Sequence, residues 1–173
     1  MTPLAKTRAR GFAVAALVLA VDQASKWAML GPLRLPDVGQ ITLLPIFDFT
    51  FTMNTGVSLG LLTAGSDGQR WALVGMTAAI ALAVFAWMLR ERRPGDIFAL
   101  GLVLGGALGN IIDRMTLGYV VDFLDLHFGS FRPFLVFNIA DAAITIGVLI
   151  ILARSFLSGE KRGHVAGQSA PES

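Results

Sequence analysis

Two aspartates, Asp122 and Asp141, lie in apolar sequence with no basic residue within a helical turn. A carboxylate in an apolar site without a nearby cation tends to raise its pKa and retain a proton. Two such groups side by side share one proton, so that one can accept a proton from water while the other donates one to a leaving group. If the fold brings these two residues together, the chemistry is that of an aspartic protease. Their spacing in the sequence does not show that they meet.

Other polar residues interrupt apolar segments at helical spacing. Asp22 and Lys26 lie four residues apart, so they share one face of a helix. An ionisable residue in a membrane span costs several kcal/mol unless it is paired or hydrated, so it is a candidate functional residue. The alternative is structural: Asp22 with Lys26, and Asp113 with Arg114, could be neutralised pairs that only hold helices together.

Two asparagines accompany these charges. Asn110 precedes Asp113 by three residues, and Asn138 precedes Asp141 by the same spacing. Such asparagines are compatible with two roles, an interhelical hydrogen bond or a contribution to the site.

A metal site is a further alternative. A magnesium ion held by Asp22, Asp113, Asp122 and Asp141 is chemically possible, although Lys26 and Arg114 already supply positive charge. A zinc site would need more ligands than the two histidines of the chain, and the absence of cysteine excludes thiolate sites and disulfides. The residues alone thus disfavour a magnesium site but leave it open.

The elements that must position these groups follow from composition. Of 173 residues, 54% are hydrophobic and 15% are charged, which leaves too little polar surface for an ordinary soluble domain. Four apolar stretches are long enough for transmembrane helices, at residues 11–30, 71–89, 97–112 and 135–153. The first could be mistaken for a cleaved signal peptide, but three further spans follow, and we interpret it as a retained helix.

Lysines and arginines indicate the orientation of the four spans. One side has nine, and the other has five spread over longer segments. The nine are Lys6, Arg8, Arg10, Arg90, Arg92, Arg93, Arg154, Lys161 and Arg162. Both termini are thus predicted to be cytoplasmic, with residues 31–70 and 114–134 as outer loops. All the polar candidates then lie near the outer leaflet boundary.

The first outer loop has a pattern of its own. Apolar and polar residues alternate over residues 47–54, which predicts a strand with one apolar face. We expect an all-α membrane protein of four transmembrane helices, with a small β-rich cradle in this loop on the outer surface. Residues 56–62 could form a short interfacial helix. The alternative is a packed lid with no role in the chemistry.

Two smaller features complete the predicted organisation. Gly101, Gly105, Gly106 and Gly109 space small residues along the third span, as close helix packing requires. Residues 1–157 are predicted to form the membrane domain, and the polar residues 158–173 a disordered cytoplasmic tail. The net charge of +2 does not favour nucleic-acid binding.

Nearly the whole chain resembles the lipoprotein signal peptidases (signal peptidase II), which are bacterial membrane aspartyl proteases. Five patterns carry the resemblance, and the last three, in this order on a four-span chain, are highly specific. They are D-x-x-x-K at residues 22–26, N-x-G at 54–56, G-N-x-x-D-R at 109–114, V-D-F at 121–123 and F-N-x-A-D at 137–141.

The resemblance implies an activity and a set of roles. Asp122 and Asp141 match the catalytic pair, which hydrolyses the peptide bond just before a diacylglyceryl-modified cysteine in a prolipoprotein. The family uses eight further positions for substrate binding or site support: Asp22, Lys26, Asn54, Gly56, Asn110, Asp113, Arg114 and Asn138. The resemblance implies no metal or organic cofactor. It also implies that the cyclic peptide globomycin inhibits the enzyme. We expect a monomer in the bacterial inner membrane, in contact with membrane lipids, with its site near the outer leaflet.

Two other classes of function remain open. A small transporter or channel could also place polar residues on several helices, but a transport path needs them across the whole membrane. A non-enzymatic assembly factor that binds lipoproteins would not need two unpaired carboxylates at one depth.

Overall fold

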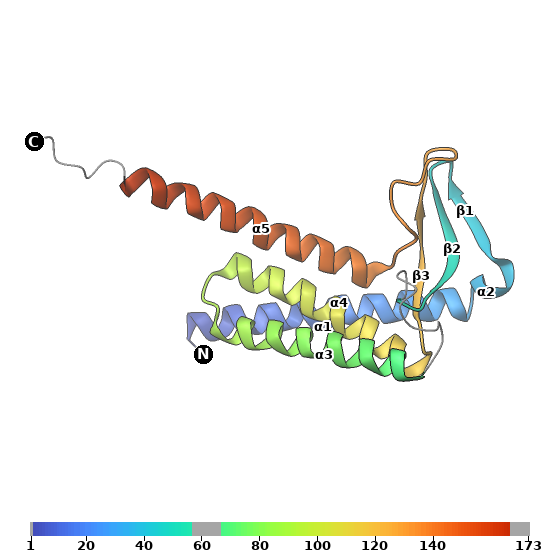
Figure 1. The fold of residues 1–173 in the computed structure, drawn as a ribbon, viewed down its shortest axis with the longest axis horizontal. Coiled ribbons are helices and arrows are strands. Elements are labelled where there is room, and N and C mark those ends of the chain that lie inside the picture. The colour runs from blue at the N-terminus through green and yellow to red at the C-terminus, as the bar shows by residue number, and fades with distance from the viewer. Residues whose placement is uncertain (1, 57–66, 167–173) are drawn as a thin grey trace, which may run out of the picture.

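Four long helices form a bundle, and a small sheet lies across one end of it (Figure 1). The computed structural model describes residues 2–56 and 67–166. The long helices are α1 (Pro3–Leu30), α3 (Asp67–Arg90), α4 (Pro94–Thr116) and α5 (Ile139–Ala166). Each is long and apolar enough to cross a membrane, as the sequence predicts. A short helix, α2 (Leu35–Val38), follows α1.

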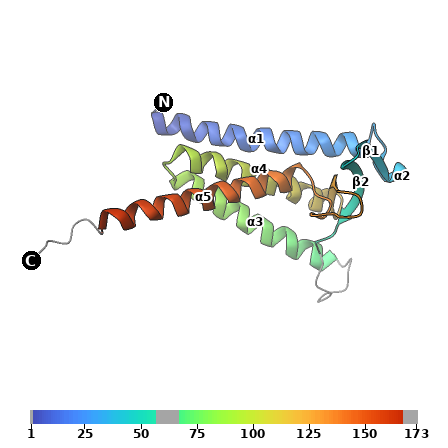
Figure 2. The ribbon, with the colours of Figure 1, turned by 90° about the horizontal axis from the view of Figure 1, so that it is seen from above.

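Helix α4 is the centre of the bundle, with α1, α3 and α5 packed around it (Figure 2). Of its membrane-length segment, 67% is buried, against 17–22% for the other three helices. Glycines allow this close packing, as the sequence predicts. A Cβ at Gly105 would lie 2.5 Å from the carbonyl oxygen of Ala15 on α1. A Cβ at Gly106 would collide with the carbonyl oxygen of Ala140 on α5.

The helix ends differ from the predicted spans at two points. Helix α5 begins at Ile139 rather than near residue 135, because Phe137 forms a β-bridge with Leu124. It continues to Ala166, beyond the predicted domain boundary at residue 157, through residues such as Glu160 and Lys161 that favour helix. The predicted interfacial helix at 56–62 lies outside the described residues from 57 onward.

The sheet has three antiparallel strands in the order β1-β2-β3. They are β1 (Gln40–Leu44), β2 (Phe47–Asn54) and β3 (Val120–Leu126). Strand β2 confirms the alternating pattern of the first outer loop. Strands β1 and β2 come from the predicted first outer loop, while β3 comes from the predicted second outer loop, residues 114–134, for which no strand was predicted. Val120–Leu126 carries apolar residues and one aspartate on each face, so it lacks the alternation that would have revealed a strand.

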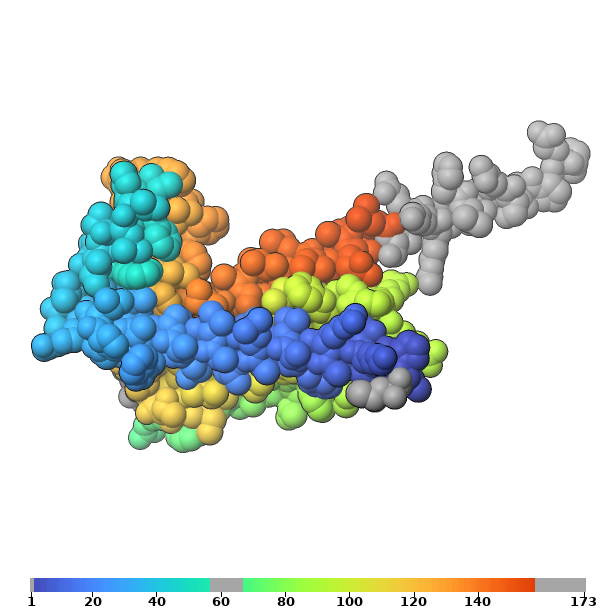
Figure 3. All heavy atoms as spheres, turned by 180° about the vertical axis from the view of Figure 1, so that it is seen from behind, coloured from blue at the N-terminus to red at the C-terminus, as the bar shows by residue number. Residues whose placement is uncertain are grey.

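The sheet is held to the bundle by an apolar cluster at the C-terminal end of α1. Met29 and Leu35 pack with Val121 and Phe123 of β3. Phe49 of β2 lies edge-on to Phe123, with ring centroids 5.8 Å apart. The sheet extends beyond the bundle on the side of α5, and a hollow separates the two when the molecule is seen from behind (Figure 3).

Candidate active site

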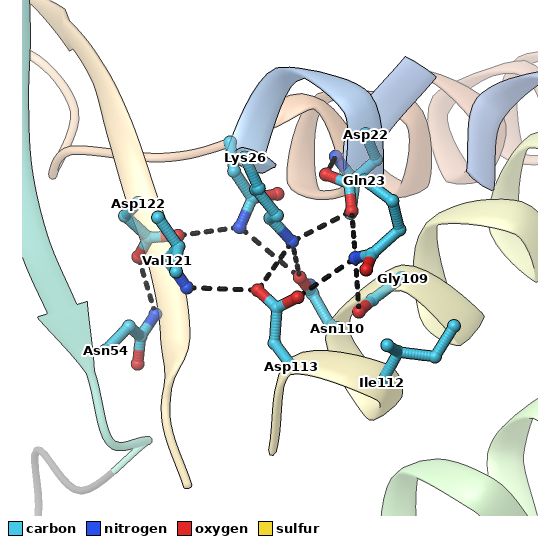
Figure 4. Close-up of polar contacts among 12 residues, drawn as sticks. Asp22, Gln23, Lys26, Asn54, Gly109, Asn110, Ile112, Asp113, Val121 and Asp122 are labelled. Atoms are coloured by element: carbon cyan, nitrogen blue, oxygen red, sulfur yellow. Dashed lines mark hydrogen bonds and ion pairs between the residues drawn. The ribbon is translucent and has the colours of Figure 1, made fainter. Parts of the chain in front are cut away.

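A buried ion cluster joins α1 and α4 (Figure 4). Lys26 Nζ lies 2.8 Å from Asp22 Oδ2 and 2.8 Å from Asp113 Oδ2, and all three side chains are almost fully buried. The predicted pairing of Asp22 with Lys26 is confirmed. Asp113 pairs with Lys26 rather than with Arg114, because adjacent residues on a helix do not face each other.

Gln23 is a member of this cluster that the sequence analysis overlooked. Its Nε2 donates hydrogen bonds to Asp113 Oδ1 at 2.9 Å, to Asp22 Oδ2 at 3.2 Å and to the carbonyl of Gly109 at 3.3 Å. The signal was present in the sequence, since a glutamine beside an aspartate in an apolar helix needs polar partners.

The cluster holds the backbone next to both candidate aspartates. Asp113 Oδ2 accepts a hydrogen bond from the N–H of Val121 at 3.1 Å, one residue before Asp122. Asp22 Oδ1 accepts one from the N–H of Ala140 at 2.9 Å, one residue before Asp141. Because Lys26 bridges Asp22 and Asp113, a single ion cluster fixes β3 and the start of α5 relative to each other.

Two asparagines link the two aspartates. Asn138 Nδ2 donates to Asp122 Oδ1 at 2.6 Å and to Asn110 Oδ1 at 3.3 Å. Asn110 Nδ2 in turn donates to Asp141 Oδ1 at 2.8 Å, and Lys26 Nζ donates to Asn110 Oδ1 at 3.2 Å. The structure therefore brings Asp122 and Asp141 into one hydrogen-bonded network, a proximity that their spacing in the sequence could not establish.

Asn138 and Asp141 also cap the first turn of α5. The N–H of Asp141 donates to Asn138 Oδ1 at 2.9 Å, and the N–H of Asn138 donates to Asp141 Oδ2 at 3.3 Å. This reciprocal pair resembles a capping box, with Asn138 at the N-cap. The sequence analysis placed both residues within the helix, but only Asp141 lies in it, in the first turn, while Asn138 precedes it. The cap holds the Asp141 carboxylate near the N-terminus of α5 rather than along the side of the helix.

Asn54, at the end of strand β2, reaches across to Asp122 on the neighbouring strand β3. Its Nδ2 donates to Asp122 Oδ2 at 2.9 Å, and its Oδ1 accepts from the N–H of Gly56 at 2.9 Å. Gly56 has a φ of +77°, which a side chain would strain. The N-x-G pattern thus orients the amide of Asn54 toward Asp122.

Burial raises the pKa of Asp122 to about 6, and the charge of Asp141 adds to this effect. Hydrogen bonds from Asn54 and Asn138 and the charge of Lys26 oppose it. The positive charge of Arg114 also interacts favourably with both Asp122 and Asp141. Lys26 and Arg114 therefore act on this pair of carboxylates in the fold, although neither aspartate has a cation nearby in the sequence.

The four aspartates do not converge on one point. Asp22 and Asp113 bind Lys26, while Asp122 and Asp141 bind asparagines. Within residues 2–56 and 67–166, no three acidic or histidine side chains are grouped as metal ligands. The magnesium alternative consequently has no preformed cluster in the described part of the chain.

Comparison with known proteins identifies the family. The model of the signal peptidase (SPase) II family matches residues 14–157. The chain belongs to the signal peptidase II family. It is therefore a protease, and with its four apolar helices it is a multi-pass protein of the bacterial inner membrane.

Curated members of the signal peptidase II family are similar over most of their length. The lipoprotein signal peptidase of Rhizorhabdus wittichii is 57% identical, with 90% of each chain covered. That of Sphingopyxis alaskensis is 52% identical over 89% of each chain, and that of Methylocella silvestris is 42% identical over 95% of each.

Two solved structures, each described as a bacterial membrane enzyme, share the fold. One is 26% identical with a TM-score of 0.73 and covers 95% of this chain and 94% of its own. The other is 29% identical with a TM-score of 0.73 and covers 84% and 92%.

Proposed function

We propose that Asp122 and Asp141 are the catalytic pair of an aspartyl endopeptidase. Its substrates are diacylglyceryl-modified prolipoproteins, which it cleaves just before the lipidated cysteine. The observation that carries this proposal is the network in which Asn138 and Asn110 join the two carboxylates. The raised pKa of Asp122, about 6, supports a proton held by the pair.

The reaction follows from one neutral and one ionised carboxyl group. The ionised group takes a proton from water, whose oxygen attacks the carbonyl carbon of the scissile bond. The neutral group gives its proton to the leaving amine as the carbon–nitrogen bond breaks. The products are a new carboxyl terminus and a new amino terminus, and the pair again holds one proton.

The surrounding residues divide into two roles. Asn54, Asn110 and Asn138 hold the carboxylates in place by hydrogen bonds. Arg114 Nη1 donates to the carbonyl of Asn110 at 3.5 Å, and its buried Nε has no hydrogen-bond partner among the described residues. We assign the remaining donors of the guanidinium to a peptide carbonyl of the substrate. Asp22, Lys26 and Asp113 act indirectly, because they hold the backbone beside Asp122 and Asp141.

We place this site at the outer leaflet boundary, with both termini in the cytoplasm and the sheet on the outer membrane surface. The excess of Lys and Arg at the opposite end of the bundle supports this orientation. At that depth the acyl chains of the substrate remain in lipid while water reaches the pair.

A transport path is less compatible with the helices. A cavity of about 540 Å³ between α1, α3 and α4 is lined by apolar residues such as Phe12, Leu82 and Leu104. It provides no polar path toward the far side of the bundle. We expect the working unit to be a monomer, because the hydrogen-bonded network between Asp122 and Asp141 is complete without a residue from a second copy.

A cleavage assay tests the proposal. The purified protein in liposomes is mixed with a prolipoprotein that carries diacylglycerol on its cysteine, and the products are weighed by mass spectrometry. We expect a cut on the amino side of that cysteine, blocked by globomycin and unaffected by EDTA. Cleavage that EDTA abolishes would favour a metal site, and no cleavage by folded protein would reject the peptidase assignment.

A further inference from the structure

A pocket of about 270 Å³ lies where the chain enters α5. Phe134, Leu135 and Phe137, from the segment before the helix, form one part of its lining. Ala142, Thr145 and Ile146 of α5 form another, and Asp141 also lines it. We call this the α5 pocket. Asp141 is the one ionisable residue in its lining, so an apolar cavity directly adjoins the proposed catalytic pair.

The α5 pocket lies at the junction between α5 and the chain that leads back to the sheet. Figure 3 shows that the molecule is hollowed between the sheet and α5. Phe134 and Leu135 are 61% and 88% exposed, so nothing in the described chain covers this side. A ligand can therefore enter sideways, from the region that the bilayer occupies in the proposed orientation.

An apolar face continues from the α5 pocket along the helix. Ile146, Leu149 and Leu152 are spaced by three residues and are 51%, 59% and 47% exposed. At that spacing they lie on one side of α5 and lead away from Asp141. A long apolar ligand that begins at the pocket can thus follow the helix into the membrane.

We propose that the α5 pocket binds an acyl chain of the diacylglyceryl group on the substrate's cysteine. This inference rests on the proposed function. The lipid is attached to the residue that follows the scissile bond, so its chains must leave the site close to the catalytic pair. Asp141 belongs to both the pair and the pocket, which places an apolar binding surface at the required position.

The larger apolar cavity between α1, α3 and α4 is a poorer candidate for the same chain. It measures about 540 Å³, but neither Asp122 nor Asp141 lines it. The α5 pocket is smaller, yet it exceeds the roughly 150 Å³ that suffice for one benzene molecule. It can hold part of one acyl chain, with the remainder along Ile146, Leu149 and Leu152.

Binding of the acyl chain in the α5 pocket contributes more to the position of the substrate than to its affinity. An acyl chain is equally apolar in the bilayer and in the pocket, so its transfer gains little from the hydrophobic effect. The gain comes from close packing against Ala142 and Thr145, which fixes where the scissile bond lies relative to Asp141.

Filling the pocket tests the proposal. Ala142→Phe places a ring in the cavity, and Ala83→Phe on the exposed face of α3 is the matched control. With the diacylglyceryl substrate, Ala142→Phe should raise KM or lower kcat/KM by about tenfold or more, while Ala83→Phe stays within about twofold of wild type. Unchanged kinetics in a folded Ala142→Phe protein would contradict the subsite.

Cross-linking provides a second measurement that does not depend on turnover. A substrate with a diazirine near the glycerol end of one acyl chain is bound to the Asp122→Asn variant and irradiated. We expect labelled peptides from residues 134–149. Labels confined to the cavity between α1, α3 and α4, or spread evenly over all lipid-facing helices, would overturn the proposal.

The two proposals can fail separately. If wild type does not cleave the substrate, the peptidase assignment fails and the subsite fails with it. If wild type cleaves, but Ala142→Phe is unaffected and labels fall elsewhere, the subsite alone is rejected.

Discussion

At the residue scale, Asn54 bears directly on the protonation of the proposed pair. It donates a hydrogen bond to Asp122, which favours the ionised carboxylate and lowers its pKa. Burial raises that pKa to about 6, so Asp122 keeps its proton below about pH 6 and loses it above. The singly protonated pair is therefore lost as the pH rises through this value.

The pH dependence of kcat/KM should show this ionisation. We expect activity to fall by about tenfold per pH unit on the alkaline side of about pH 6. Asn54→Ala removes a donor that favours the ionised form, so it should move the alkaline limb to higher pH as well as lower the maximum.

Thr50→Ala is the matched control for Asn54→Ala on the same strand. Thr50 donates a hydrogen bond to Asp125 rather than to Asp122, at 3.0 Å. Its removal should leave the alkaline limb in place. If Asn54→Ala and Thr50→Ala move the limb equally, or neither moves it, Asp122 is not the group that titrates.

At the scale of elements, Asp113 joins α4, α1 and β3. It accepts hydrogen bonds from Lys26, Gln23 and the N–H of Val121 while almost fully buried. Asp113→Asn weakens a buried ion cluster and should lower the free energy of unfolding by about 3 kcal/mol. Thermal unfolding in detergent, followed by circular dichroism, measures this loss.

Asp37→Asn is the control for charge removal alone. Asp37 pairs with Arg34 at the surface, where both side chains are more than half exposed. Its loss should change stability by less than about 0.5 kcal/mol. Equal melting temperatures for Asp113→Asn and Asp37→Asn would show that the buried cluster does not hold the elements together.

Helix packing gives a second prediction at this scale. A methyl group at Gly105 meets the backbone of α1 at Ala15, so Gly105→Ala should destabilise the fold by about 1–3 kcal/mol. Gly75 on α3 has nothing within 4 Å of the added Cβ, so Gly75→Ala should be neutral or slightly stabilising. A reversed order of melting temperatures would refute the packing of α1 on α4.

The elements also show what the sequence could and could not predict. The four spans were predictable because a membrane helix needs a long apolar run, and strand β2 because its residues alternate. Strand β3 was not, since a mostly apolar segment without alternation, such as Val120–Leu126, is equally compatible with a helix segment or a loop. The cap formed by Asn138 and Asp141 had a local signal, an asparagine three residues before an aspartate, which was interpreted as a helix face instead.

Contacts between distant elements required the structure. Spacing alone predicts that Lys26 pairs with Asp22, but the pairing of Lys26 with Asp113 depends on how α1 packs on α4. The link from Asp122 through Asn138 and Asn110 to Asp141 joins β3, α4 and the start of α5, and no local pattern encodes it. Of these contacts, only the pair of Asp22 and Lys26 was predicted from spacing.

At the scale of the whole molecule, the proposed orientation can be measured cleanly because the chain contains no cysteine. Single cysteines at Arg92, between α3 and α4, and at Ser130, after β3, lie at opposite ends of the bundle. In intact spheroplasts a membrane-impermeant maleimide should label Ser130→Cys and should label Arg92→Cys only after permeabilisation. The reverse pattern would invert the topology and move the site to the cytoplasmic side.

The most direct test of the account is the cleavage rate of Asp122→Asn and Asp141→Asn under single-turnover conditions. Asp125→Asn is the control, since Asp125 lies on the same strand as Asp122 but pairs with Arg132. With each protein shown to be folded, we predict a loss of at least about a thousandfold for the first two and near-normal turnover for the third. Near-normal turnover by either Asp122→Asn or Asp141→Asn would contradict the catalytic pair.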